Sequence, residues 1–221
     1  MTPRPYSSHD RQRTVDAGHD RILAAALELL QRGDLAAVSL EDVAQRAGVT
    51  RMTVYNQFGS KAGLLEELFD QLVTRGAFNE MPAIFMEKDV GAAFDALVKV
   101  FGRFYTENRP VMARMRAAAG SDPDLDAAMR KRNDRRRRAI ETLVQRLGKK
   151  HRPSVPDEEL VTTLDVLLSF NTFDMIAGPS RTPEDVAPVM RRLIRSVLGI
   201  TKRRSPSPGQ PPRKKRGPTR K

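Results

Sequence analysis

Apolar residues recur three or four positions apart along most of the chain, a spacing that places them on one face of an α-helix. Stretches with this pattern are 20–32, 40–47, 51–58, 61–72, 90–107, 110–115, 123–147, 157–176 and 182–198. Residues 77–88 lack the period, and we expect them to be irregular. The pattern therefore predicts an all-α fold.

Residues 39–61 have the spacing of a helix-turn-helix. Ser39 can cap the first helix, and Gly48 allows the sharp turn that ends it. Ala44 is small enough for two helices to cross, Gly48 follows four residues later, and Val54 anchors the second helix six residues after that. These features predict a compact unit that can place its second helix in the major groove of DNA.

The outward side chains of this second helix have the chemistry of DNA contacts. Asn56 and Gln57 can each pair with adenine and Arg51 with guanine, while a methyl-bearing side chain suits thymine. Hydroxyl groups commonly take phosphate oxygens, and Lys61 stands where the exposed amides of the next helix would help to hold a phosphate. With the capping serine included, the candidate DNA-binding residues are Ser39, Thr50, Arg51, Met52, Thr53, Tyr55, Asn56, Gln57 and Lys61.

Residues 20–70 resemble the DNA-binding domain of the TetR family of bacterial transcriptional regulators, above all in the block AGVTRMTVYNQFGSKAGLL at 47–65. The resemblance covers roughly the first third of the chain. It implies phosphate contacts by Thr50, Thr53, Tyr55 and Lys61. The positions that vary within the family, and would therefore distinguish one operator from another, are Met52, Asn56 and Gln57.

The same resemblance implies a homodimeric repressor that a small apolar or amphipathic effector releases from a palindromic operator. In proteins of this kind the last two helices pair with their copies across a two-fold axis, and a palindrome of double-stranded DNA independently asks for a dimer. We expect a small helix-turn-helix domain followed by a larger helical domain for ligand binding and dimerisation. The expected parts are a disordered arm (1–18), the helix-turn-helix domain (19–65), the regulatory and dimerisation domain (66–200) and a disordered basic tail (201–221).

The chain has a formal net charge of +12, but most of that charge lies at its far end. Residues 201–221 hold nine Lys or Arg and no acid, so the rest of the chain is nearly balanced. Pro, Ser and Gly are also frequent there, which predicts disorder. A basic arm would attract DNA phosphates whatever the base sequence, and a solvated tail without a specific role fits the same composition.

Phe and Met side chains on the predicted body helices are candidates for lining an effector pocket, although the same residues can serve as ordinary core. Arg132 and Arg136 stand where the helical period calls for apolar residues, and either could meet an anionic effector or pair with a neighbouring acid. Asn171 and Asp174 interrupt an apolar surface and could orient a ligand. The full candidate set is Phe101, Phe104, Tyr105, Met112, Met115, Met129, Arg132, Arg136, Asn171 and Asp174.

A second hypothesis is a DNA-bound regulator whose helical body recruits a protein partner and has no small-molecule effector. The two hypotheses differ in whether a ligand should stabilise the purified protein by mass action.

The sequence offers no chemistry for an enzyme, a cofactor or a metal site. It has no cysteine, and its three histidines, His9, His19 and His151, fall in predicted tails or loops without metal-ligand spacing. It has no nucleophile elbow and no glycine-rich phosphate loop. No apolar run approaches a membrane span, and the polar start lacks the apolar segment of a signal peptide, so we expect a cytoplasmic protein without a membrane partner.

Overall fold

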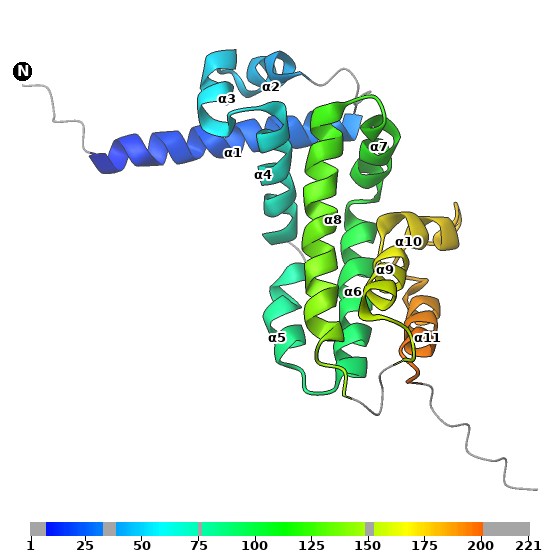
Figure 1. Ribbon diagram of the computed structural model, residues 1–221. Helices are drawn as coiled ribbons and strands as arrows, with labels where there is room; N and C mark the ends of the chain where they lie inside the picture. The colour runs from blue at the N-terminus through cyan, green and yellow to red at the C-terminus, as the bar shows by residue number, and fades with distance from the viewer. Residues whose placement is uncertain (1–7, 33–38, 75–76, 149–152, 201–221) are drawn as a thin grey trace, which may run out of the picture.

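The computed structural model describes residues 8–32, 39–74, 77–148 and 153–200, and within these ranges the chain is helical without a β-strand. The head consists of α1 (Ser8–Arg32), α2 (Leu40–Ala47) and α3 (Arg51–Phe58), and α4 (Lys61–Thr74) leads from it into the body (Figure 1). The body continues with a 3-10 helix (Ala77–Glu80), α5 (Met81–Met86), α6 (Val90–Glu107), α7 (Arg109–Ala119), α8 (Pro123–Val144), α9 (Asp157–Leu167), α10 (Phe170–Ala177) and α11 (Ala187–Val197). The prediction of an all-α fold is confirmed.

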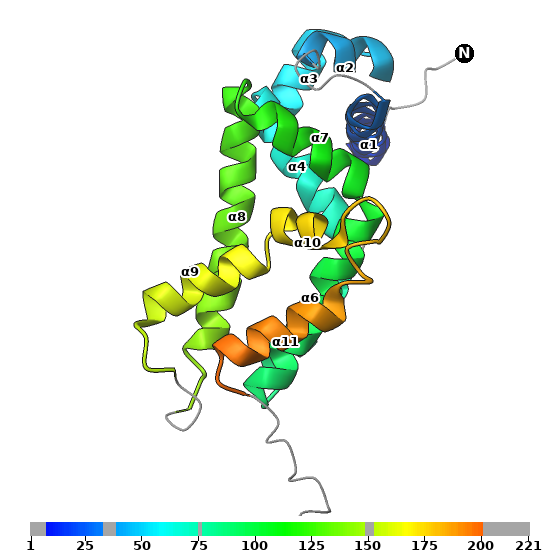
Figure 2. The same cartoon turned by 90° about the vertical axis from the view of Figure 1, so that its right-hand side faces the viewer.

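Helix α8 runs along the length of the body and connects its parts (Figure 1). It packs against α4 and α7 near the head and against α6 and α9 farther along. Helix α11 lies across α6 and α9 on the side that faces the viewer in Figure 2. The head therefore contacts the body through α4, α7 and the beginning of α8.

The core of the body is built on α6, whose Phe94, Leu97, Phe104 and Tyr105 are fully buried. The Tyr105 ring lies edge-on to Phe173, with centroids 5.4 Å apart. Its hydroxyl donates a hydrogen bond of 2.9 Å to the carbonyl of Leu168, which satisfies a polar group that would be costly to bury alone. Tyr105 thus ties α6 to the junction of α9 and α10.

Helix α1 begins at Ser8, so the prediction that residues 8–18 belong to a disordered arm is wrong. Gly18 is buried inside this continuous helix. Once the packed part of a helix is formed, each further residue adds a hydrogen bond at little cost, and the Arg, Gln and Ala of 11–17 favour that extension. Residues 1–7 lie outside the described residues.

Two further boundaries differ from the predictions. Residues 77–86 form the 3-10 helix and α5, because Pro82 suits a first helical turn and the buried Ile84 anchors it. The single helix predicted for 157–176 is broken into α9 and α10, which are bent by 47°. Ser169 causes a new start there, since its Oγ accepts a hydrogen bond of 3.3 Å from the amide of Thr172.

The last helix begins later than predicted, at Ala187 instead of residue 182. Pro188 lacks an amide proton and is tolerated in the first turn of a helix but not in its interior. Before it, Thr182 and Asp185 bond each other's amides at 2.8 and 3.2 Å and hold a separate turn.

Candidate nucleic-acid interface

Helix α2 starts with a capping box. The Oγ of Ser39 accepts a hydrogen bond of 3.2 Å from the amide of Asp42, and the carboxylate of Asp42 accepts one of 2.9 Å from the amide of Ser39. The bonds from Ser39 hold the pKa of Asp42 below its ordinary value. Ser39 is exposed, and its observed contacts fix the start of α2.

The turn between α2 and α3 has the geometry that the sequence predicts. Gly48 has φ 66°, a left-handed conformation that favours glycine, and the amide of Val49 donates to the carbonyl of Ala44 at 3.0 Å. Thr50 then caps α3, because its Oγ1 accepts from the amide of Thr53 at 3.1 Å. The two helix ends are thus held by bonds within a few residues of the turn.

The outer face of α3 is open to solvent. Met52 and Tyr55 are 64% and 55% exposed, which is unusual for such large apolar groups, and Arg51 and Asn56 are exposed beside them. The inner face is fixed by the buried Val54 and Phe58. The structure therefore brings Thr50 and these four predicted residues to one end of the molecule: Arg51, Met52, Tyr55 and Asn56.

Two predicted DNA-binding residues are less accessible than the others. Thr53 is half-buried, and its hydroxyl lies 2.9 Å from that of Thr50. Gln57 is also half-buried, its Oε1 is buried without a hydrogen-bond partner, and it faces Gly18 of α1. A role for Gln57 in reading bases remains a prediction that would require its amide to turn outward.

His19 lies in α1 rather than in a tail, contrary to the prediction. Its ring stacks on Phe58 at the end of α3, with centroids 4.8 Å apart, and its Nε2 is 2.8 Å from a carboxylate oxygen of Glu67 in α4. His19 thus connects α1, α3 and α4. The sequence pattern placed the start of this helix at residue 20, so it left His19 outside the helix and missed these contacts.

The first turn of α4 approaches the end of α3 very closely. A Cβ at Gly63 would lie 2.1 Å from the carbonyl oxygen of Phe58, so no larger residue fits without a backbone shift. The amide of Gly63 donates to the Oγ of Ser60 at 3.0 Å. This glycine therefore sets the distance between α3 and the helix that carries Lys61.

Lys61 is held by a carboxylate of the body. Its Nζ is 2.5 Å from Oδ2 of Asp122, and the two side chains are only 19% and 12% exposed. The other oxygen of Asp122 caps α8, accepting from the amides of Asp124 and Leu125 at 3.1 Å each. The sequence gave no signal that Asp122 would contact Lys61, because the two residues are 61 positions apart along the chain.

Burial works to raise the pKa of Asp122, but the bonds from Lys61 and the α8 amides outweigh it and leave the pKa below its ordinary value. A carboxylate whose folded pKa is depressed stabilises the fold above its unfolded pKa of about 4. That stabilisation is lost as the pH falls through the lower, folded value.

Further ion pairs join α4 to α8. Glu66 pairs with Lys131, and Asp70 pairs with Arg135. With the pair of Lys61 and Asp122, they place charges of opposite sign along the whole contact between the two helices. The orientation of α4 is therefore tied to that of α8.

The predicted effector residues fall into two groups. Phe101, Phe104, Tyr105, Met112 and Met115 are at most 4% exposed and lie in one core, with Met129 packed against it. Arg132 and Arg136 reach the same region from α8. The other two candidates lie elsewhere, since Asn171 is exposed and Asp174 pairs with Arg109 and Arg116 of α7.

Within the described ranges, no group of three or more His, Asp or Glu side chains could hold a metal ion. No single helix there is long and apolar enough to cross a membrane, and only the bent pair α9 and α10 has the combined length and composition for it.

Two family models match the chain. Residues 22–68 match the model of bacterial regulatory proteins of the tetR family, and residues 88–199, half of the chain, match the tetracyclin repressor-like C-terminal domain. The chain belongs to the TetR family. The family consists of helix-turn-helix transcriptional regulators, which agrees with the geometry of α2 and α3 and with the absence of enzyme motifs in the sequence.

Individual TetR-family proteins resemble part of the chain. It is 35% identical over 89 residues to the regulator AlkX of Mycobacterium tuberculosis, covering 40% of this chain and 41% of AlkX. It is 38% identical over 82 residues to the regulator EthR of Mycolicibacterium smegmatis, covering 33% of this chain and 38% of EthR. The matches therefore span less than half the length of these relatives.

Solved structures of TetR-family regulators share the fold over most of the chain. NalD, a secondary repressor of the MexAB-OprM multidrug efflux pump in Pseudomonas aeruginosa, superposes with a TM-score of 0.63 at 20% identity, covering 82% of this chain and 96% of NalD. A regulator from Saccharomonospora viridis in complex with choline superposes with a TM-score of 0.58 at 19% identity, covering 83% of this chain and 96% of that regulator.

Proposed function

We propose that the chain is a homodimeric transcriptional repressor that reads a palindromic operator with α3 of each copy and leaves it when a small molecule binds the body. The observation that carries the proposal is the exposed outer face of α3, which follows the left-handed turn at Gly48 and begins at the cap formed by Thr50. Arg51, Met52 and Asn56 would contact base edges. Thr50, Thr53, Tyr55 and Lys61 would contact phosphates.

The proposed division of the chain follows the contacts of the helices. The helix-turn-helix domain would run from the start of α1 to residue 65 instead of covering 19–65, and the regulatory and dimerisation domain would cover 66–200, with α4 shared between them. A role of the basic tail (201–221) in non-specific DNA affinity also belongs to the proposal, and that tail lies outside the described residues.

The proposed DNA-binding face is tested by two variants, each of which removes one positive charge, one on α3 and one on α8. Arg51→Ala should lower affinity for duplex DNA of mixed sequence by about 10-fold and reduce the slope of log affinity against log salt by about 1, because a cation on the face that meets DNA displaces counterions even when it contacts a base edge. Arg138→Ala is the control, since Arg138 is also exposed but lies on α8. Fluorescence anisotropy over a salt series measures both. Equal losses for the two variants would contradict the proposed face.

Lys61 must exchange Asp122 for a phosphate if it is to contact DNA in the proposed way. Asp122→Asn should therefore raise duplex affinity by about 3- to 10-fold, because the asparagine keeps the helix cap but no longer holds the ammonium group. Asp124→Asn, an exposed change of the same charge in the same turn, should have a smaller effect. Both comparisons use anisotropy at constant salt.

A double-variant cycle separates this competition from general electrostatics. In a Lys61→Met background, Asp122→Asn should no longer differ from Asp124→Asn. A gain that persists without Lys61 would contradict competition between Asp122 and a phosphate.

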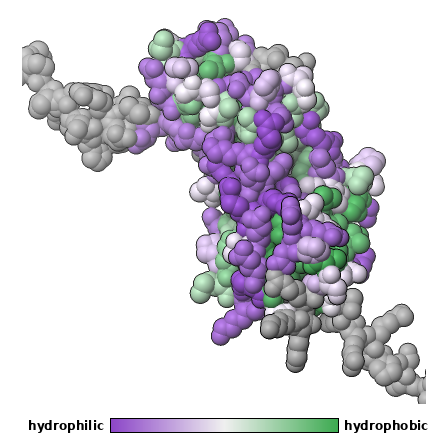
Figure 3. Space-filling view, in the orientation of Figure 1, coloured by the Kyte–Doolittle hydropathy of each residue, from purple (hydrophilic) through white to green (hydrophobic). Residues whose placement is uncertain are grey.

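The proposed dimer surface lies on α9, α10 and α11. Val166, Met175 and Leu193 are 58%, 76% and 40% exposed on these three helices. Figure 3 shows hydrophobic residues gathered on this side of the body, whereas hydrophilic residues cover α8. An apolar surface of this kind is typical of a protein interface. Two copies joined there would present two α3 helices to one palindrome.

A small-molecule effector is favoured by the grouping of aromatic, methionine and arginine side chains between α6 and α8. The choline complex of the S. viridis regulator is a precedent within the same fold. The alternative, a body that recruits a protein partner without an effector, is favoured by the close packing of these rings, which are at most 4% exposed. A ligand-induced rise in melting temperature would separate the two.

A further inference from the structure

Arg132 projects from α8 among aromatic rings. Its guanidinium carbon lies 5.6 Å from the ring centre of Phe69 in α4, and 5.7 Å from the ring centres of Phe104 and Tyr105 in α6. Aromatic faces attract a cation, but they do not neutralise it. The planar group therefore sits in a largely apolar setting at the junction of three helices.

The basic residues around Arg132 on α8 have acidic partners. The pairs are Arg130 with Asp126, Lys131 with Glu66, Arg135 with Asp70, Arg136 with Asp165 and Arg137 with Glu141. Arg138 is exposed and can rely on water. Among the described residues, no carboxylate lies within ion-pair distance of Arg132, although its side chain is half-buried.

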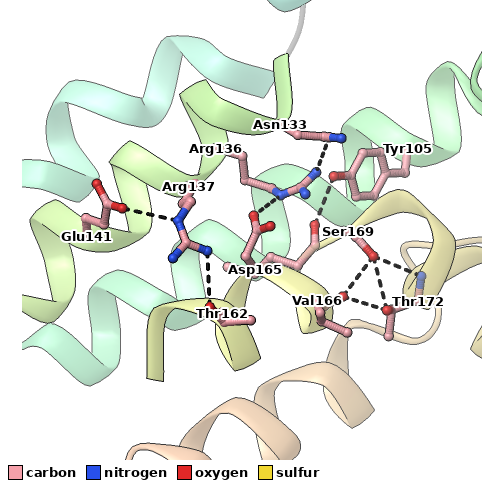
Figure 4. A network of polar contacts seen from close by, with 11 residues as sticks. Tyr105, Asn133, Arg136, Arg137, Glu141, Thr162, Asp165, Val166, Ser169 and Thr172 are labelled. Atoms are coloured by element: carbon pink, nitrogen blue, oxygen red, sulfur yellow. Dashed lines mark hydrogen bonds and ion pairs between the residues drawn. The ribbon is translucent and has the colours of Figure 1, made fainter. Parts of the chain in front are cut away.

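The nearby carboxylate is already committed to Arg136. The Nε of Arg136 is 2.7 Å from Asp165, a second nitrogen is 3.1 Å from the amide oxygen of Asn133, and the side chain is only 7% exposed (Figure 4). Burial lowers the pKa of Arg132 from its ordinary value; the hydroxyl of Tyr105 acts against this shift, and the charge of Arg136 adds to it. Asp165 thus pairs with Arg136, and Arg132 has no carboxylate partner among the described residues.

We propose that Arg132 binds the carboxylate of the effector, and that the apolar part of this molecule lies against Phe104 and Tyr105. This inference rests on the proposed function, because it names the chemical class of the effector. A guanidinium presents paired N–H donors that match the two oxygens of a carboxylate. One unmatched positive charge in an apolar setting suits a monoanion better than a phosphate, whose second charge would have to be buried without a partner.

The position of Arg132 also supplies a route to the head. Its guanidinium contacts Phe69 of α4, the helix that begins at Lys61. A carboxylate that reorients Arg132 changes this contact. Since ion pairs join α4 to α8, such a change alters the angle at which α4 holds the head.

The test compares carboxylates with amides of the same shape. Benzoate, phenylacetate and decanoate are titrated into the full-length protein beside benzamide, phenylacetamide and decanamide, with melting temperature and calorimetric Kd as readouts. At least one acid should bind at least about 10-fold more tightly than its amide, because hydrogen bonds between charged groups are the stronger kind. The same acid should lower DNA affinity.

Arg132→Met is the decisive variant, and Arg138→Met is its matched control on the exposed face of the same helix. Arg132→Met should lose about 10- to 100-fold in affinity for the acid and should melt at the same temperature as the unchanged protein or higher, because it removes an unpaired charge. Arg138→Met should bind the acid normally. A lower melting temperature for Arg132→Met, without any preference for acids, would identify a purely structural cation and overturn the inference.

The failures of the two proposals are distinguishable. If the protein binds a selected DNA sequence and no acid of the series binds better than its amide, the carboxylate site is wrong and the regulator stands. If it binds no DNA sequence specifically, the proposed function itself fails, whatever the acids do.

Discussion

The double replacement Val166→Glu and Met175→Glu is expected to convert the dimer into monomers and to lower affinity for an inverted-repeat DNA site by about 100-fold or more. Both side chains are apolar and more than half exposed, at 58% and 76%. In a dimer formed through α9 to α11 they would be buried, and each copy would have to desolvate two unpaired carboxylates. Without the dimer, the second head is no longer held near its half-site.

Sedimentation measures the oligomeric state of this variant, and anisotropy measures its affinity for a full and a half palindrome. Met86→Glu is the control, because Met86 is 81% exposed but lies on α5, away from the proposed dimer surface. The double variant should bind the half palindrome with the same affinity as the unchanged protein. If the double variant stays dimeric, the two-fold contact lies on a different surface.

Arg136→Met is expected to lower the free energy of unfolding by about 3 kcal/mol, the size of the effect when one partner of a buried ion pair is removed. Asp165 is only 22% exposed and would keep its charge without the guanidinium that binds it at 2.7 Å. Figure 4 places this pair between α8 and α9, so its loss also weakens the contact between these helices.

Urea unfolding of the unchanged protein, Arg136→Met, a double variant and a control variant separates the effect of the unpaired charge from the effect of lost packing. The double variant Arg136→Met with Asp165→Leu should recover most of the lost stability, since it leaves no unpaired charge. Arg137→Met is the control. That arginine is 33% exposed, and its pair with Glu141, which is 43% exposed, is long, at 3.3 Å. A change below about 1 kcal/mol is therefore the expected result. A small effect of Arg136→Met alone would show that water already solvates Asp165.

The sequence predicted the head well because its determinants are local. The capping box at Ser39, the left-handed Gly48 and the cap at Thr50 each act through bonds to residues a few positions away. Such bonds leave a direct pattern in the sequence. The exposure of Met52 and Tyr55 follows once Val54 and Phe58 are placed inside.

Contacts between distant segments could not be predicted in the same way. Nothing near Lys61 indicates that Asp122 will hold it, and nothing near His19 indicates Phe58 or Glu67. These contacts depend on how whole helices pack, which periodicity does not determine.

Apolar periodicity also hid a break in the body. The apolar pattern continues from α9 into α10, so it gave no sign of the bend at Ser169. For Arg132 and Arg136, the period correctly placed both on an inward face but left their partners open. In the structure, Arg136 forms an ion pair with Asp165, and Arg132 lies against aromatic rings.

The central claim is that two α3 helices of a dimer read one palindrome. Selection of duplex fragments from a random library by the purified protein, followed by sequencing, tests it most directly. The account predicts enrichment of an inverted repeat whose half-sites are centred about 10 base pairs apart, or a multiple of that distance. Asn56→Ala should relax the preference at particular base pairs of each half-site. Enrichment of no sequence, or of a single unrepeated site, would contradict the account.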